Sequence, residues 1–297
     1  MEAQTLRQIL VLTGLTLCSI SDGYILGQSS GMIDALRSKN STIVITEDEL
    51  YWIASSIQIT CFCGFAILAI LTEILGRRKA ISILNVPILI SWVIVYFANN
   101  MAMLLISRII LGISYGGVIL LTYICVGEYA SPNIRSLSLN LMGSVGTLFG
   151  ASLAHLLSLI MPWRTVALIG IVPTIPAIVI PFFWVESPAW LASKGRFEEC
   201  KQSFQALHVT NDVTIRELAL LISLEIKEQS KFKKNMCLFE TIKTKIWIAI
   251  KQKYFWKISI LNTTINIYRI AGGRLLFTTL AITILKDITG DNDILSS

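Results

Sequence analysis

The chain has 297 residues, of which 54% are hydrophobic and only 15% are charged, and its mean hydropathy is +0.68. Soluble domains carry roughly 25% charged residues, so this composition excludes an ordinary soluble enzyme and predicts an integral membrane protein. The net charge of +6 could suit nucleic acid, but most basic residues fall in one set of loops between apolar stretches, and the other set holds only Arg37, Lys39, Arg164 and Lys286, so no nucleic-acid partner is expected.

Seven apolar stretches are long enough to cross a bilayer, which takes about 20 helical residues. None of them shows the alternation of a barrel strand, and backbone groups cannot stay unpaired in lipid, so we expect an all-α integral membrane fold. The predicted spans are residues 8–30, 50–72, 80–99, 102–125, 138–160, 165–184 and 257–285.

The basic residues predict the orientation of these spans. If the amino terminus is cytosolic, Arg7, Arg77 to Lys79, Arg135 and the basic residues from Lys194 to Lys257 are inside, as the positive-inside rule requires. The loop after the first span is then outside. It contains the sequon Asn40-Ser41-Thr42, so Asn40 is a candidate glycosylation site.

The loop after the second span reads Glu73-Ile74-Leu75-Gly76-Arg77-Arg78-Lys79. Gly76 permits a tight turn between antiparallel helices, Glu73 would cap a helix end, and the arginines can reach neighbouring helix ends and acidic groups. A simple positively charged stop-transfer cluster would have the same arginines and lysine.

Three further charges, Glu128, Arg135 and Glu186, are expected at the same membrane depth as Arg77 and Arg78. Guanidinium groups fit carboxylates with two parallel hydrogen bonds, and partial desolvation strengthens such pairs. We therefore expect a cytosolic ion-pair network that acts as a gate, although a purely structural network would use the same residues. Its members are Glu73, Arg77, Arg78, Glu128, Arg135 and Glu186.

About 70 polar residues follow the sixth span. Apolar residues recur at helical spacing within 196–207 and 214–228, which predicts short cytosolic helices against the inner ends of the spans. The expected domains are a six-span bundle at 1–184, a helical linker at 185–256, and a seventh span with an outer-loop stub at 257–297.

Ordered motifs give the chain a family resemblance. They are Arg108 with Gly112, Glu128 to Arg135, Trp163-Arg164, Glu186-Ser187-Pro188-Ala189-Trp190-Leu191 and Lys194-Gly195-Arg196. Together they resemble the sugar porter family of the major facilitator superfamily, and the stretch from Ile45 to Ser55 is similar to insect facilitated trehalose transporters. The resemblance implies a six-helix amino-terminal bundle, cytosolic helices, and the first helix of a second bundle after which the chain looks truncated.

Departures from the family pattern concern the substrate site. The position that matches a sugar-contacting glutamine of related glucose carriers is Gly143, and Arg269 and Arg274 stand in a segment of span seven where relatives carry amides. Intramembrane arginines should face an aqueous cavity or an acidic partner, such as Asp22 on span one. Either the substrate is altered or anionic, or the site is eroded, or the arginines have partners in spans that would follow the seventh. The neutral candidates for contacts with sugar hydroxyls are Gln28, Ser144, Thr147 and Tyr268.

The expected function is therefore facilitative transport of a sugar, trehalose or a hexose, by alternating access in the plasma membrane. The implied partners are the sugar and the lipid bilayer; no covalent chemistry, metal or cofactor is implied, and self-assembly is left open. The alternatives are a non-transporting sugar sensor or partner subunit, or an inactive fragment of a full-length carrier.

Overall fold

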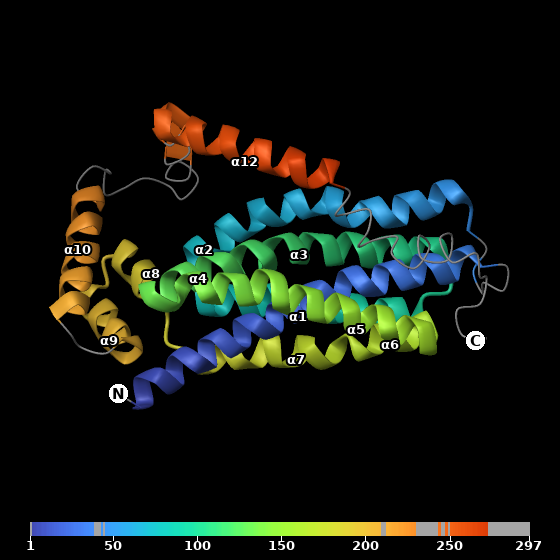
Figure 1. Cartoon of the computed structure of the whole chain (residues 1–297), viewed down its shortest axis with the longest axis horizontal. Coiled ribbons are helices and arrows are strands. Elements are labelled where there is room, and N and C mark those ends of the chain that lie inside the picture. The colour runs from blue at the N-terminus through green and yellow to red at the C-terminus, as the bar shows by residue number, and fades with distance from the viewer. Residues whose placement is uncertain are drawn as a thin grey trace.

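The computed structural model describes residues 2–38, 43, 45–208, 212–229, 243–244, 247–248 and 250–272. Every regular element in this part of the chain is a helix, as the sequence predicts, and the long helices pack into one elongated bundle (Figure 1). Asn40, the predicted glycosylation site, lies outside the described residues.

Five helical stretches of the described chain are long and apolar enough to cross a membrane. They begin and end close to the predicted spans one to six, and most extend beyond them by one or two turns. The elements are α1 (Glu2–Arg37), α2 (Glu47–Phe97), α3 (Met101–Tyr129), the continuous run α4 (Pro132–Asn140), η1 (Leu141–Gly146) and α5 (Thr147–Ile160), and the run α6 (Trp163–Ile169), α7 (Ile171–Val179) and η2 (Ile180–Phe183).

Helix α2 comprises the second and third predicted spans. They are separated by a break in the helical backbone at Gly76 (φ 82°, ψ −176°). The arms on either side, residues 47–75 and 77–97, run in opposite directions (Figure 1). The first arm starts with a capping box, in which Thr46 accepts from the N–H of Glu49 and Glu49 accepts from the N–H of Thr46.

Small residues let the bundle helices approach closely. A Cβ on Gly64 of α2 would come within 2.1 Å of the carbonyl oxygen of Ile113 on α3, so only glycine fits at this crossing. Aromatic side chains also pack in the interior: Tyr24 and Trp92 meet edge to face with ring centroids 5.9 Å apart. The hydroxyl of Tyr24 donates to the carbonyl of Val166 at 2.7 Å, so its polar end is satisfied within the core.

Three shorter helices gather at one end of the bundle, α8 (Pro188–Ser193), α9 (Phe197–Leu207) and α10 (Asp212–Gln229) (Figure 1). The last two confirm the helices predicted at 196–207 and 214–228. This end of the bundle, which holds Gly76, Glu128 and Glu186, is named the linker end below. The first turns of α1 extend to it, where the Gln4 side chain donates to the carbonyl of Gln205 at 2.9 Å.

Helix α12 (Lys253–Ala271) covers the described beginning of the predicted seventh span. It is not among the helices long and apolar enough to cross a membrane, and nearly all its described side chains are exposed. Residues 273–285 of that span lie outside the described chain. The seventh span and the three-domain division therefore stay predictions.

Candidate functional site

Arg77 and Glu128 form a forked ion pair at the linker end. Nε of Arg77 lies 2.9 Å from Oε2 of Glu128, and Nη2 lies 2.7 Å from Oε1. The two side chains are only 19% and 16% exposed, so water screens the pair weakly. Glu128 stands in the last turn of α3, where the helix dipole disfavours a carboxylate, so the guanidinium offsets an otherwise unfavourable position.

Glu186 caps the second arm of α2. Its Oε1 accepts hydrogen bonds from the backbone N–H groups of Arg77 at 2.9 Å, Arg78 at 3.2 Å and Ser187 at 3.0 Å. The first N–H groups of a helix have no partner within the helix, and its amino-terminal end favours negative charge. Glu186 therefore satisfies two of the donors that the break at Gly76 leaves free.

Ser187 connects these two groups of contacts. Its hydroxyl donates to Oε2 of Glu128 at 2.6 Å and accepts from the N–H of Trp190 at 3.2 Å, as the cap of α8. Pro188 occupies the first turn of that helix, where proline is favoured. Ser187 belongs to the motif Glu186-Ser187-Pro188, but the motif alone predicts no role for it. A serine directly before a proline is nevertheless typical of a helix start.

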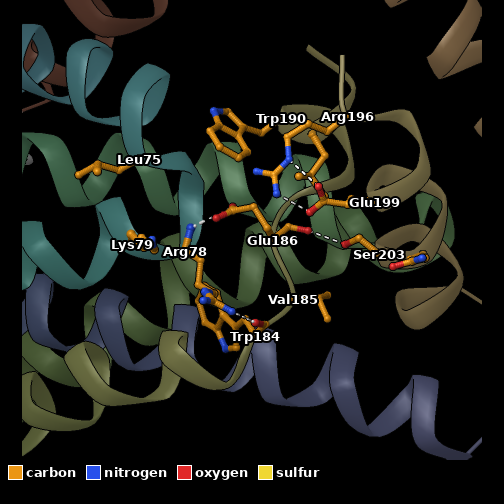
Figure 2. Close-up of a pocket in the computed structure, with 12 residues that line it drawn as sticks. Leu75, Arg78, Lys79, Trp184, Val185, Glu186, Trp190, Arg196, Glu199 and Ser203 are labelled. Atoms are coloured by element: carbon orange, nitrogen blue, oxygen red, sulfur yellow. Dashed lines mark hydrogen bonds and ion pairs between the residues drawn. The ribbon is translucent and has the colours of Figure 1, made fainter. Parts of the chain in front are cut away.

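The other predicted gate residues make different contacts. Glu73 accepts from Nζ of Lys194 at 2.6 Å. Nη1 of Arg78 donates to the carbonyl of Trp184 at 2.8 Å (Figure 2). Arg135 donates to the carbonyl of Ala130 at 3.2 Å and has no carboxylate partner among the described residues. In this conformation, Arg77, Glu128 and Glu186 are thus brought together, while Arg135 lies outside their hydrogen-bonded cluster.

Gln28, a predicted substrate contact, is fully buried and binds a buried arginine. Its Oε1 accepts from Nη2 of Arg108 at 2.9 Å, and Nη1 of Arg108 donates to the hydroxyl of Ser29 at 3.0 Å. Arg108 has no ion-pair partner in the described part of the chain, and the Nε2 group of Gln28 has no acceptor there. A buried charge balanced only by neutral groups is costly and is usually functional in a spanning helix.

Gly143 and Ser144 lie in η1, a π-helical turn, and Thr147 begins α5 directly after it. Such turns occur often at functional sites. A Cβ on Gly143 would come within 2.7 Å of the hydroxyl of Tyr123, which α3 places there. Tyr123 was missed by sequence reasoning, since nothing local links residues of two different helices.

The remaining substrate candidates belong to the end of the chain. Tyr268 on α12 is 80% exposed. The side chain of Arg269 and the whole of Arg274 lie outside the described residues, and so does any pairing between them and Asp22. Asp22 itself is buried, and its Oδ1 has no hydrogen-bond partner within the described residues.

Comparisons with known proteins agree with these observations. A family model described as "Sugar (and other) transporter" matches residues 8–280. A facilitated trehalose transporter Tret1 from Apis mellifera ligustica is 26% identical over 274 residues, which cover 89% of this chain and 54% of that protein. The human solute carrier family 2, facilitated glucose transporter member 6, is 29% identical over 209 residues, 70% of this chain and 41% of that protein. The chain thus spans about half the length of the curated relatives it matches.

Solved structures show the same architecture. The proton:xylose symporter XylE bound to 6-bromo-6-deoxy-D-glucose superposes with a TM-score of 0.66 at 20% identity, over 76% of this chain and 55% of that one. An inward-open XylE from E. coli gives a TM-score of 0.61 at 19% identity, over 94% of this chain and 69% of that one. These structures share the major facilitator fold with the bundle, and the family model covers most of the sequence: the chain belongs to the sugar transporter family.

Proposed function

We propose that this chain serves facilitative transport of a sugar, trehalose or a hexose, across the plasma membrane by alternating access. In this proposal the amino terminus and the linker end face the cytosol, as the distribution of basic residues favours. The observation that carries the proposal is the cluster in which Ser187 joins the Arg77–Glu128 pair to Glu186.

In this proposal the cluster acts as a gate. It ties the turn of α2 and the end of α3 to the segment before α8, so these parts move together while the contacts last. Alternating access requires such contacts at one end of a carrier to form and break. A hydrogen bond to a charged group is worth about 2 kcal/mol, and losing one would shift a two-state equilibrium by roughly thirtyfold.

The proposed substrate is neutral and rich in hydroxyl groups, like the sugars named for the relatives. Gln28, Ser144, Thr147 and Tyr268 offer neutral donors and acceptors that bind hydroxyls without stripping water from a charge. Tyr123 adds a hydroxyl beside Gly143. The substrate gradient alone would drive transport, with no covalent chemistry, metal or cofactor.

A second candidate function is a sugar sensor or partner subunit that does not transport. Two of the predicted sugar-contacting positions favour it. The side-chain oxygen of Gln28 already accepts a hydrogen bond from Arg108, and Gly143 has no side chain that could bind sugar. A protein that binds sugar weakly and stays in one conformation would fit both observations.

The test is uptake of labelled trehalose and glucose by the purified chain in proteoliposomes, with an Arg77→Gln variant and an Arg37→Ala control. Arg37 forms an exposed pair with Glu47 and takes no part in the cluster. Saturable uptake that Arg77→Gln reduces and Arg37→Ala preserves would support the carrier. Saturable sugar binding without uptake would favour the sensor, and absence of both would overturn the proposal.

A further inference from the structure

A cavity of about 450 Å³ lies at the linker end, outside the Arg77–Glu128 pair. It is bounded by the turn of α2, the segment leading into α8, and the first turns of α9 (Figure 2). Its lining includes Arg78 and Lys79 on one side and Arg196 on the other, with Trp184 and Trp190 in its walls. The gate residues Arg78 and Glu186 line part of it, but none of the proposed sugar contacts does.

The acidic groups of the cavity already have donors. Glu186 accepts three backbone N–H groups, and the two carboxylate oxygens of Glu199 receive Nε and Nη2 of Arg196. Glu186 and Glu199 are therefore balanced by groups within the protein.

The basic groups on the opposite side are not balanced in this way. Lys79 is exposed and has no ion pair among the described residues. Arg78 reaches only the carbonyl of Trp184, and its Nε has no acceptor within the described chain. The cavity thus presents two adjacent cations that have no carboxylate partner among the described residues, which is the chemistry that recognises phosphate.

The size and walls of the cavity indicate that the phosphate would carry an organic group. Pockets for small organic molecules occupy about 300–1,000 Å³, whereas one water takes about 30 Å³ and an inorganic anion only a few times more. Leu75 and Leu191 supply apolar wall, and Nζ of Lys194 lies 5.9 Å from the ring centroid of Trp190, which holds the indole in place. Gln202 and Ser203 on α9 add polar groups suited to hydroxyls, although the Ser203 hydroxyl already donates to the carbonyl of Glu186.

We propose that this cavity binds an organic phosphate, with Lys79 and Arg78 on the phosphate and the tryptophan walls on its organic part. The source is either a phospholipid headgroup at the membrane surface or a soluble phosphate ester. Because the ligand would touch both α2 and α9, it would fasten the linker helices to the bundle and stabilise the protein by mass action. The inference holds whether or not the chain transports sugar.

The experiment uses the purified full chain and two kinds of probe. The soluble probes are glucose 6-phosphate and myo-inositol 1-phosphate, with inorganic phosphate as a comparison. The lipid probe is phosphatidylinositol 4-phosphate in phosphatidylcholine nanodiscs, compared with phosphatidylcholine alone. Thermal unfolding reports stabilisation, and native mass spectrometry reports the bound species.

Lys79→Gln is the test variant and Lys201→Gln the matched control, because Lys201 is an exposed lysine of α9 that pairs with Glu198 outside the cavity. We expect at least one organic phosphate to raise the melting temperature. Lys79→Gln should weaken its binding by about tenfold, as for loss of one charge-assisted hydrogen bond, and Lys201→Gln should not. An unchanged melting temperature of ligand-free Lys79→Gln would show that its fold is intact.

Each outcome decides something. If only the phosphatidylinositol 4-phosphate nanodiscs bind, the ligand is a phospholipid headgroup. If glucose 6-phosphate or myo-inositol 1-phosphate binds, the ligand is a soluble phosphate ester. If Lys79→Gln and Lys201→Gln weaken binding of the probe equally, the probe is attracted by the positive charge of the surface in general, and the proposed site is wrong. No stabilisation by any probe would overturn it as well. Sugar uptake is not among the readouts, so failure here leaves the transport proposal to its own test.

Discussion

Glu186 occupies the space that a side chain on residue 76 would need. A Cβ on Gly76 would come within 2.6 Å of Oε2 of Glu186, and the backbone there has φ 82° and ψ −176°, a region that is essentially restricted to glycine. The same carboxylate receives the N–H groups of Arg77 and Arg78. The turn of α2 and the charged cluster are therefore one structural unit.

Gly76→Ala should destabilise this unit. The backbone cost alone is about 1–3 kcal/mol, and displacement of Glu186 would expose the donors that it caps. We expect a clear fall in the melting temperature of the purified protein. Gly127→Ala is the control, because a Cβ there meets nothing within 4 Å and alanine favours the helix. Equal melting temperatures for the two variants would contradict the role given to the turn.

The Arg77–Glu128 pair should show strong coupling in a double-mutant cycle. Arg77→Gln or Glu128→Gln alone leaves a partly buried charge without its partner, whereas the double variant removes both charges. We expect a coupling energy of about 1–3 kcal/mol in thermal or chemical unfolding. The exposed Arg37–Glu47 pair, with side chains 35% and 59% exposed, should give less than about 1 kcal/mol. Similar values for both pairs would mean that burial adds nothing at the cluster.

Gln28→Glu should separate stability from function. A carboxylate in place of the amide would give the buried guanidinium of Arg108 a counter-charge, so the melting temperature should rise. Sugar uptake should fall, because the neutral amide expected to bind hydroxyls is lost. Gln205→Glu, on the exposed side of α9, should change neither. A lower melting temperature for Gln28→Glu would show that Arg108 is already neutralised by another route.

Gly143→Ala should perturb the π-helical turn through Tyr123. The new methyl group would come within 2.7 Å of the tyrosine hydroxyl, so the ring must move. We expect a higher KM for sugar uptake. Adding Tyr123→Phe removes the hydroxyl and should restore part of the affinity if the effect is steric. No change in KM for Gly143→Ala would remove Tyr123 from the proposed site.

Docking of α9 on the first turns of α1 should weaken in mild acid. Burial lowers the pKa of His208, and nearby Arg135 lowers it further, against the opposite effect of Glu217. The ring lies 3.3 Å from Nε2 of Gln8, which donates to the neutral form. An undocked histidine has the ordinary pKa of about 6.5, whereas docked His208 has a lower one. Between these two pKa values the undocked form binds more protons, so the docked state loses stability as the pH falls through this window.

Hydrogen exchange of residues 197–207 measures this effect. Protection should fall between neutral pH and the lowered pKa of His208, after correction for the intrinsic exchange rate. His208→Gln should remove the pH dependence while keeping an amide near Gln8. A pH dependence that persists in this variant would assign the effect to another group.

Several features of this protein were determined by the sequence alone. The spanning helices follow from the length of the apolar stretches, the linker helices α9 and α10 from local periodicity, and the reversal at Gly76 from a glycine in a charged loop. All of these depend on residues that are neighbours in the chain. Local sequence is sufficient to determine them, because a bilayer or a helix imposes the same requirement wherever it occurs.

Tertiary structure alone decided which charges meet. Arg77 pairs with Glu128 across 51 positions and binds Glu186 across 109, while Arg135, expected in the same network, reaches only a nearby backbone carbonyl. Gln28 was expected to contact substrate; in this structure its oxygen accepts from Arg108, and its contact with sugar stays a prediction. These outcomes depend on how each helix is rotated about its axis and how closely small residues let helices approach. Many distant residues set that rotation and spacing together, and no local pattern in the sequence records the result.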